Sequence, residues 1–210
     1  MRVTAKICGL STPETLAAAI GGGASRVGFV LFPPSPRNVT IAQLAGLTAQ
    51  VPPRVARVGV FVDPDDALLT AAAPHLDAIQ LHKTTPARVA AIRAQTGRET
   101  WAAVAVKTRA DLDGARDHVD AADLILYDAK TPDGAALPGG MGLRFDWALL
   151  DGVRHPLPWA LSGGLDPANV AEAIGRTRAA LVDVSSGVES GPGVKDVDKI
   201  AAFLQAVARC

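Results

Sequence analysis

Residues 3–30 read VTAKICGLSTPETLAAAIGGGASRVGFV and contain the pattern that decides the fold. Two apolar stretches of strand length, 3–8 and 26–30, enclose an Ala-rich segment, 13–20, whose apolar residues recur at helical spacing. Thr12 precedes Pro13, and a hydroxyl residue before a proline is a common start of a helix. The stretch is therefore predicted to form two parallel strands joined by a right-handed helical crossover.

The same alternation of strand and helix recurs along the rest of the chain. The other expected strands are 57–61, 78–81, 100–106, 124–127, 159–162 and 181–184. The other expected helices are 41–50, 65–73, 86–96, 110–119, 145–150, 167–176 and 197–208. Thr40, Thr85 and Asp166 precede three of these helices as capping side chains. Eight such units in ~200 to 250 residues predict an α/β fold of one closed (β/α)8 barrel, a TIM barrel, spanning residues 1–210.

The main alternative is an open, doubly wound sheet. That fold predicts a G-x-G-x-x-G turn directly after the first strand. Here Cys8-Gly9-Leu10 follows the strand, and the glycine run 21–23 comes only after the first helix. The barrel is therefore favoured, and the longest irregular stretch, about 129–144, is expected to lie over its active face.

Composition limits the classes of partner. The 210 residues carry 21 Lys and Arg against 21 Asp and Glu, so no net charge attracts a nucleic acid or an anionic membrane surface. No stretch approaches the ~18 uncharged apolar residues of a membrane span, and the first ten residues lack the order of a signal peptide. Cys8 and Cys210 are too few for a disulfide framework. We expect a soluble, cytoplasmic protein, and the sequence leaves both a monomer and a homodimer open.

Two turns rich in glycine and serine follow the last two expected strands. Gly163-Gly164 stands after strand seven, and Ser185-Ser186-Gly187 stands after strand eight. Glycine lets backbone N–H groups approach an anion closely, and barrels commonly bind phosphate at these two places. Such pairs are also ordinary turns between strand and helix, but their presence after both strands favours a phosphate site.

Cys8 ends the first expected strand. Lys6 stands two residues earlier, so both side chains point to the same face, which in a barrel can be the interior. A nearby cation favours the thiolate, which can remove a carbon-bound proton or attack an electrophile. The other interpretation of Cys8 is a small buried apolar residue.

Asp128 directly follows the apolar residues 124–127, so its carboxyl is expected in the mouth of the barrel and away from bulk solvent. Such surroundings disfavour the ionised form, and a carboxylic acid that is protonated near neutral pH can act as a general acid. The alternative for an isolated Asp is a helix or loop cap. The sequence therefore makes Asp128 a candidate acid without deciding between the two roles.

Two further residues are candidates for binding substrate. Arg37 follows residues 33–36, whose three prolines stiffen the loop and can hold its guanidinium as a clamp for a carboxylate or phosphate. His82 follows the fourth expected strand and can hydrogen-bond a substrate or serve a structural purpose.

Taken together, these strand-end residues resemble those of phosphoribosylanthranilate isomerase, over nearly the whole chain from Lys6 to the C-terminal helix. The similar motifs are Lys6-Ile7-Cys8-Gly9-Leu10, Gly28-Phe29-Val30, Pro33-Pro34-Ser35-Pro36-Arg37, Val58-Gly59-Val60-Phe61-Val62, Gln80-Leu81-His82, Gly139-Gly140, Phe145-Asp146-Trp147, Ser162-Gly163-Gly164-Leu165 and Asp183-Val184-Ser185-Ser186-Gly187-Val188-Glu189. The chain departs from the family at Lys83, where Gly is usual, and at Met141, where Thr is usual.

The resemblance implies an Amadori rearrangement of N-(5-phosphoribosyl)anthranilate in L-tryptophan biosynthesis, with no metal and no organic cofactor. It implies that Asp128 protonates the ribose ring oxygen to open a Schiff base, and that Cys8 then takes the proton from C2′. Arg37 would hold the anthranilate carboxylate. The two turns rich in glycine and serine would hold the phosphate.

Three other functions remain as alternatives. The isomerase of histidine biosynthesis performs the same rearrangement, but it has a carboxylate where Cys8 stands and binds phosphate in both halves of its barrel. A metal-dependent ribulose-phosphate epimerase needs His and Asp ligands on inward strands, which the histidines here do not match. A binding barrel without activity is expected to have lost Cys8 or Asp128, and both are present.

Overall fold

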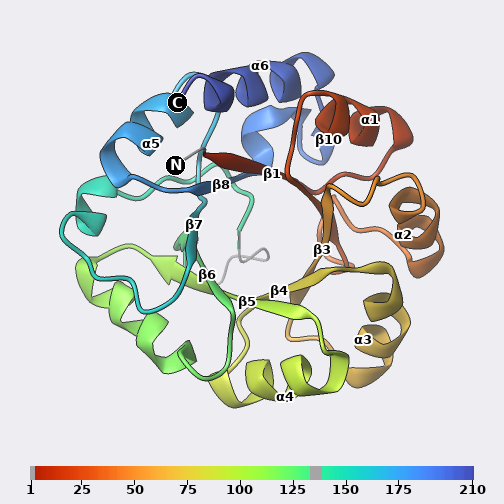
Figure 1. Ribbon diagram of the computed structural model, residues 1–210, viewed down its shortest axis with the longest axis horizontal. Helices are drawn as coiled ribbons and strands as arrows, with labels where there is room; N and C mark the ends of the chain where they lie inside the picture. The colour runs from red at the N-terminus through yellow and green to blue at the C-terminus, as the bar shows by residue number, and fades with distance from the viewer. Residues whose placement is uncertain (1–2, 133–138) are drawn as a thin grey trace.

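Eight parallel strands close into a ring, which Figure 1 shows end-on. The computed structural model describes residues 3–132 and 139–210. The strands are β1 (Thr4–Cys8), β2 (Arg26–Val30), β3 (Ala56–Val62), β4 (Ala78–His82), β5 (Glu99–Val106), β6 (Leu124–Ala129), β7 (Trp159–Leu161) and β8 (Leu181–Val184). Each pairs in parallel with the next, and β8 pairs with β1. This topology confirms the predicted (β/α)8 barrel.

Side chains of the strands alternate between the helix layer and the barrel interior. In β1, Ala5 and Ile7 belong to the core between strands and helices, whereas Lys6 and Cys8 face the interior. A separate buried cluster fills the interior with apolar side chains: Val58, Ala78, Trp101, Leu124, Leu126, Ala160 and Leu181. The polar side chains at the carboxyl ends of the strands therefore lie next to an apolar cluster that fills the barrel interior.

Helices surround the strands in the order that the sequence predicts (Figure 1). They are α1 (Pro13–Gly21), α2 (Ile41–Thr48), α3 (Asp66–Ala72), α4 (Pro86–Thr96), α5 (Val170–Thr177) and α6 (Val197–Ala208). Thr12, Thr40 and Thr85 cap α1, α2 and α4 by accepting backbone N–H groups of the first turn, which confirms these three predicted caps. Within the described ranges, no helix has both the length and the apolar character needed to cross a membrane.

Three of the expected helices differ from their prediction. Segment 110–119 forms the 3-10 helix η2 (Arg109–His118), whose buried side chains Leu112, Ala115 and His118 recur at the three-residue period of that helix. Segment 145–150 shortens to the 3-10 helix η3 (Trp147–Leu150). The helix expected at 167–176 begins only at Val170. Asp166 does not cap it, because Asp166 accepts N–H groups of Ala168 and Asn169 in a turn that precedes the helix.

A β-hairpin that the sequence did not predict lies between β8 and α6. It follows the 3-10 helix η4 (Ser186–Val188) and pairs β9 (Glu189–Gly191) with β10 (Val194–Lys195). One further 3-10 turn, η1 (Ala73–His75), extends α3. The hairpin begins directly after one of the predicted phosphate-binding turns, so its two strands bring additional side chains to that turn.

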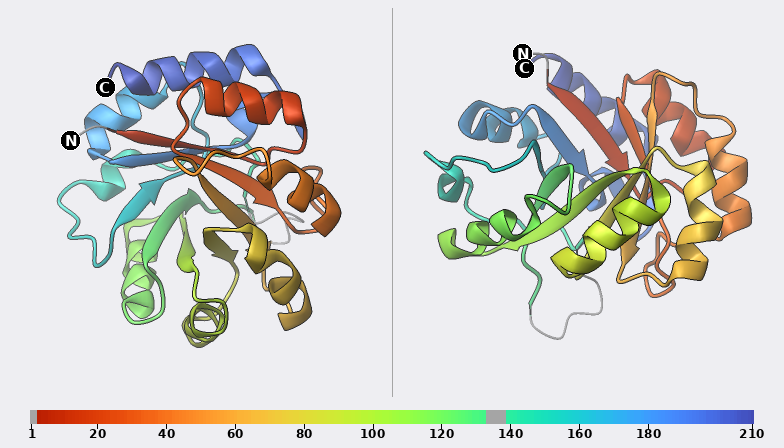
Figure 2. Two further views of the ribbon diagram at one scale, coloured as in Figure 1. Left: turned by 45° about the vertical axis from the view of Figure 1, so that its right-hand side comes forward. Right: turned by 60° about the horizontal axis from the view of Figure 1, so that its bottom comes forward.

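In the long segment between β6 and η3, the described residues lie on the side of the barrel opposite the two chain termini (Figure 2). The segment includes the predicted irregular stretch 129–144, of which residues 133–138 lie outside the described residues. Residues 139–143 line the cavity at the carboxyl ends of the strands. Those five residues therefore lie over the active face, as predicted.

Lys83, which directly follows β4, has a backbone φ of 53°. An L-residue in this left-handed region costs roughly 1–2 kcal/mol, and glycine avoids this cost while losing about 0.5–1 kcal/mol more backbone entropy. We expect Lys83→Gly to raise the free energy of unfolding in urea by up to about 1 kcal/mol. Lys83→Ala keeps the Cβ and is the matched control, so an equal gain in both variants would contradict this explanation.

Candidate active site

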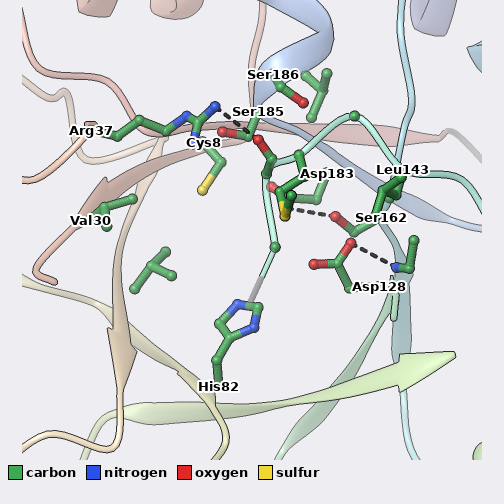
Figure 3. A pocket seen from close by; sticks show the side chains of 18 of the residues that line it. Cys8, Val30, Arg37, His82, Asp128, Leu143, Ser162, Asp183, Ser185 and Ser186 are labelled. Atoms are coloured by element: carbon green, nitrogen blue, oxygen red, sulfur yellow. Dashed lines mark hydrogen bonds between the residues drawn. The ribbon is translucent and has the colours of Figure 1, made fainter. Parts of the chain in front are cut away.

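A cavity opens at the carboxyl ends of the strands. Cys8 from β1, His82 from β4 and Asp128 from β6 extend into the same space from different sides (Figure 3). The same cavity is lined by Arg37 and by four of the predicted phosphate-binding residues, Gly163, Gly164, Ser185 and Ser186. Gly187 lines the adjoining groove, which Ser186 and Gly164 share. The fold thus gathers the predicted site residues at one end of the barrel.

Asp128 is buried, with 7% of its surface exposed. Its Oδ1 accepts the backbone N–H of Ala129 at 2.9 Å. Burial, and secondly the negative charge of Asp183, raise the pKa of Asp128 to about 7. This is the direction that the apolar strand before Asp128 predicts, and it leaves a large protonated fraction at neutral pH.

Two glycines allow the backbone to cover the Asp128 carboxyl. Gly163 has a φ of 89°, and a Cβ there would lie 2.6 Å from the Ala129 nitrogen and 3.1 Å from Asp128 Oδ1. A Cβ on Gly139 would lie 2.5 Å from Asp128 Oδ2. At Gly163 the close atom belongs to the backbone and cannot move aside, so a residue without a side chain is needed there, and the backbone of both glycines contributes to the burial of the carboxyl.

Lys6 and Asp183 form a buried ion pair beneath Cys8 and Asp128. The two residues are direct neighbours in the pairing of β1 with β8, and Lys6 Nζ lies 2.8 Å from Asp183 Oδ1. Lys6 also donates to Gln80 Oε1 at 2.9 Å, and Ser162 Oγ donates to Asp183 Oδ2 at 3.2 Å. Burial opposes the ammonium, but Asp183 and Cys8 outweigh it, so the pKa of Lys6 is raised.

Cys8 differs from the sequence-based expectation in its acidity. Burial raises the pKa of the Cys8 thiol, and the charge of Lys6 offsets this only in part. Lys6 does act in the predicted direction, but its ammonium is already paired with Asp183. The free site therefore holds Cys8 mainly as the thiol at neutral pH.

His82 is a neutral hydrogen-bonding group. Burial, and secondly the charge of Lys6, lower its pKa to about 4. Its Nε2 lies 2.9 Å from Gln80 Nε2. Because Gln80 accepts from Lys6 through Oε1, its Nε2 is the donor, so His82 Nε2 accepts and Nδ1 carries the proton. A neutral imidazole with this tautomer can donate to a ligand in the cavity.

Arg37 is held by a carboxylate as well as by its proline-rich loop. Its Nε donates to Glu189 Oε1 at 2.7 Å and its Nη2 to Glu189 Oε2 at 2.8 Å. Nη2 also donates to the Gly140 carbonyl at 3.0 Å. The guanidinium that was predicted to bind a substrate anion therefore already binds Glu189 through Nε and Nη2. Among the described residues, Nη1 is the nitrogen of the Arg37 guanidinium that has no partner.

Sequence reasoning missed four side chains that organise the site. Asp183 had a signal, because a charged residue inside the apolar run 181–184 must find a buried partner. Gln80 had the same signal inside 78–81. Glu189 stood within a quoted motif without a role. Lys195 had no signal, because its position depends on the unpredicted hairpin.

In the part of the chain that the structure describes, no group of three or more His, Cys, Asp or Glu side chains is arranged to hold a metal ion. The ionisable residues that line the cavity are instead Cys8, Arg37, His82, Asp128 and Asp183. Of these, Asp183 is paired with Lys6 and Arg37 with Glu189. The arrangement offers one buried acid and one thiol, beside donors for anions.

Comparison with known proteins gives consistent matches. The family model of N-(5'phosphoribosyl)anthranilate (PRA) isomerase matches residues 5–206. The N-(5'-phosphoribosyl)anthranilate isomerase of Paracoccus denitrificans (strain Pd 1222) is 56% identical over 207 residues, which are 97% of this chain and 96% of the relative.

Two solved structures are also similar. A phosphoribosyl anthranilate isomerase in complex with reduced 1-(o-carboxyphenylamino)-1-deoxyribulose 5-phosphate has a TM-score of 0.85 and 33% identity, with 99% of this chain and 100% of that chain covered. Mutually generated monomers of the dimeric isomerase from Thermotoga maritima have a TM-score of 0.84 and 34% identity, with the same coverage.

Proposed function

The chain belongs to the N-(5'-phosphoribosyl)anthranilate isomerase family, and on this basis we propose that Asp128 and Cys8 are its general acid and general base. The enzyme isomerises N-(5'-phosphoribosyl)anthranilate to 1-(2-carboxyphenylamino)-1-deoxyribulose 5-phosphate in L-tryptophan biosynthesis. The observation that carries the proposed roles is that a carboxyl with a pKa of about 7 and a buried thiol line one cavity.

Asp128 acts first, as the acid. It donates its proton to the ribose ring oxygen while the C1′–O bond breaks and the anthranilate nitrogen lone pair forms a C1′=N bond. The product is an open-chain cationic Schiff base, and Asp128 is left as a carboxylate. A raised pKa suits this step because the free site then carries the proton at neutral pH.

Cys8 acts second, as the base. Its thiolate takes the proton from C2′, and the C2′–H electrons form a C1′–C2′ double bond while the C1′=N electrons return to nitrogen. The enolamine then gains a proton at C1′ and loses one from the C2′ hydroxyl to give the ketone. The positive Schiff base is the electron sink, so this chain needs only one acid and one base for the rearrangement.

The remaining side chains hold the substrate between these two groups. We assign the binding of the anthranilate carboxylate to Arg37 Nη1, and we assign to His82 a hydrogen bond that its Nδ1–H donates to the substrate. The phosphate is assigned to the two predicted turns, Gly163-Gly164 and Ser185-Ser186-Gly187. Anchoring the substrate at both ends fixes the ribose, which converts binding energy into correct orientation.

The pH profile of kcat/KM follows from two opposed pKa values. Asp128 must be protonated while Cys8 is ionised, although Asp128 is the stronger acid in the free site. That combination is a small and constant fraction between the two pKa values. We expect kcat/KM to fall about tenfold per unit below roughly pH 7, stay level above it, and fall again above the pKa of Cys8. A maximum in the acid range, measured in buffers of constant ionic strength, would contradict these roles.

The decay of the fluorescence of N-(5'-phosphoribosyl)anthranilate, after this substrate is mixed with the purified protein, tests the function directly. Rapid first-order decay is the expected result. A protein that bound the phosphorylated product without catalysing decay would retain the phosphate site and exclude the isomerase activity. We further propose that residues 1–210 form one catalytic domain that works in the cytoplasm as a monomer or homodimer.

A further inference from the structure

We propose that the hairpin of β9 and β10 positions the residues that bind the two charged ends of the substrate. Glu189 holds Arg37 in one orientation, and Lys195 holds the Ser185 turn and places a positive charge beside it. The inference rests on the proposed function, since it takes Ser185 to hold the substrate phosphate. Glu189 and Lys195 touch the binding residues and not the reacting atoms, so both are positioning residues.

Glu189 lies between Arg37 and Lys195 and contacts both. Each of its oxygens accepts from the Arg37 guanidinium, at 2.7 and 2.8 Å, and Oε1 also accepts from Lys195 Nζ at 2.7 Å. Its Oε2 further accepts the Gly193 N–H at the hairpin turn, at 3.2 Å. A guanidinium held at two nitrogens has one orientation, and Nη1 is left for a ligand.

Lys195 connects the hairpin to the phosphate turn. Its side chain is 1% exposed, and Nζ donates to the Ser185 carbonyl at 2.8 Å and to Ser185 Oγ at 3.3 Å. Because Oγ accepts from the ammonium, the hydroxyl proton of Ser185 points elsewhere and can be donated to an anion. Figure 3 shows Ser185 next to Arg37, on the Cys8 side of the cavity.

The buried charges at the hairpin do not balance. Arg37 and Lys195 are cations, Glu189 is the carboxylate that both contact, and this leaves one positive charge next to the turn among the residues described. Burying an uncompensated charge is costly, and a phosphate dianion at Ser185 removes this cost. Burial lowers the pKa of Lys195, although Glu189 opposes this, so a bound anion also favours the charged ammonium.

The hairpin is anchored well enough to hold these positions. Lys195 and Glu189 face each other in the register of β9 with β10. On the α6 side, Lys199 Nζ donates to the Glu189 carbonyl at 2.7 Å, and the Asp196 N–H donates to the Val188 carbonyl at 2.9 Å. The ion pair is therefore fixed by backbone contacts on both of its strands.

The test compares Lys195→Met, Lys195→Arg and Lys107→Met. Lys195→Met leaves the Arg37–Glu189 pair intact, and Lys107→Met, the matched control, removes an exposed lysine that follows β5 and is not part of the cavity lining. We expect Lys195→Met to raise both KM and the dissociation constant of inorganic phosphate by about 10- to 100-fold, with kcat changed less than about threefold. Lys195→Arg should restore most of both values, and Lys107→Met should resemble the wild type.

The outcomes separate this inference from the proposed function. Unchanged KM and phosphate affinity in Lys195→Met would overturn the inference, and so would a fall in kcat alone. Isothermal titration with inorganic phosphate does not depend on activity, so it still tests Lys195 if the wild type fails to turn over. If Lys195→Met does not fold, Lys195→Gln, which keeps a donor for Ser185 without the charge, is judged by the same criterion.

Discussion

Asp128→Asn is expected to lower kcat by about two to four orders of magnitude and to change KM by less than a few-fold. The amide has nearly the shape of the carboxyl but carries no proton that it can give to the ribose ring oxygen. The backbone of Ala129, Gly139 and Gly163 still surrounds it, so the cavity keeps its form. Steady-state decay of substrate fluorescence measures both constants.

The pH profile distinguishes a lost acid from a damaged site. With Asp128 absent, the remaining requirement is the Cys8 thiolate, so the residual rate should rise with pH across the range where the wild type is level. A residual rate that is parallel to the wild type at every pH would show that Asp128 is not the acid.

The same variant should be more stable than the wild type at alkaline pH. The pKa of Asp128 is about 7 in the folded protein and close to 4 in an unfolded chain. The folded state therefore binds the proton more tightly, and wild-type stability falls as pH rises from about 4 to 7, by up to about 4 kcal/mol. Asn does not ionise and lacks this loss. Urea unfolding at pH 5 and pH 8 should show the difference, and a variant that is less stable at pH 8 would contradict the raised pKa.

Cys8→Ala is the companion variant for the base. It too should lose about two to four orders of magnitude in kcat. Cys8 lies between Val30 and Val60, so alanine removes a sulfur atom from an apolar contact and leaves the Lys6–Asp183 pair in place. Full activity in either variant would leave the fold intact and remove that residue from the mechanism.

Local patterns were sufficient to predict the barrel. Strands β2 and β8 have the bounds that alternating apolar and β-branched residues predict, and α4 and α6 begin and end as expected. The two strands are short runs of mostly buried residues, and each of the two helices has a buried apolar face, so a single sequence displays both patterns. Segment 110–119 was harder, because apolar residues three apart fit an α-helix and a 3-10 helix equally well.

The sequence was sufficient to predict where the candidate site residues gather, but not their electrostatics. The rule that barrels carry chemistry at the carboxyl ends of their strands placed Cys8 and Asp128 at one cavity. The pKa of Asp128 depends on burial and on Asp183, and the pKa of Cys8 depends on burial, on Lys6 and then on Asp183. Burial and the distant Asp183 cannot be read from the residues around either position. Arg37 and Glu189 form an ion pair although they lie 152 positions apart in the sequence, and no local pattern predicts such a pair.

Glu189→Gln is expected to lower the free energy of unfolding by about 3–5 kcal/mol, as when one partner of a buried ion pair is removed. The substitution removes the carboxylate between Arg37 and Lys195 and leaves two buried cations facing a neutral amide. Asp77→Asn is the matched control, because Asp77 pairs with Arg57 at a partly exposed position and should lose no more than about 1 kcal/mol. Urea unfolding at neutral pH measures both.

The loss of stability in Glu189→Gln should depend on pH and on the presence of Lys195. Burial alone would raise the pKa of Glu189, but Arg37 and Lys195 outweigh it and hold that pKa below its usual value. A lowered folded-state pKa gives stability that is present above the unfolded pKa and disappears as pH falls through the folded one. The wild type and Glu189→Gln should therefore converge in acid. Adding Lys195→Met to Glu189→Gln removes one of the two facing cations, so it should recover part of the stability, whereas an additive loss would show that charge is not the cause.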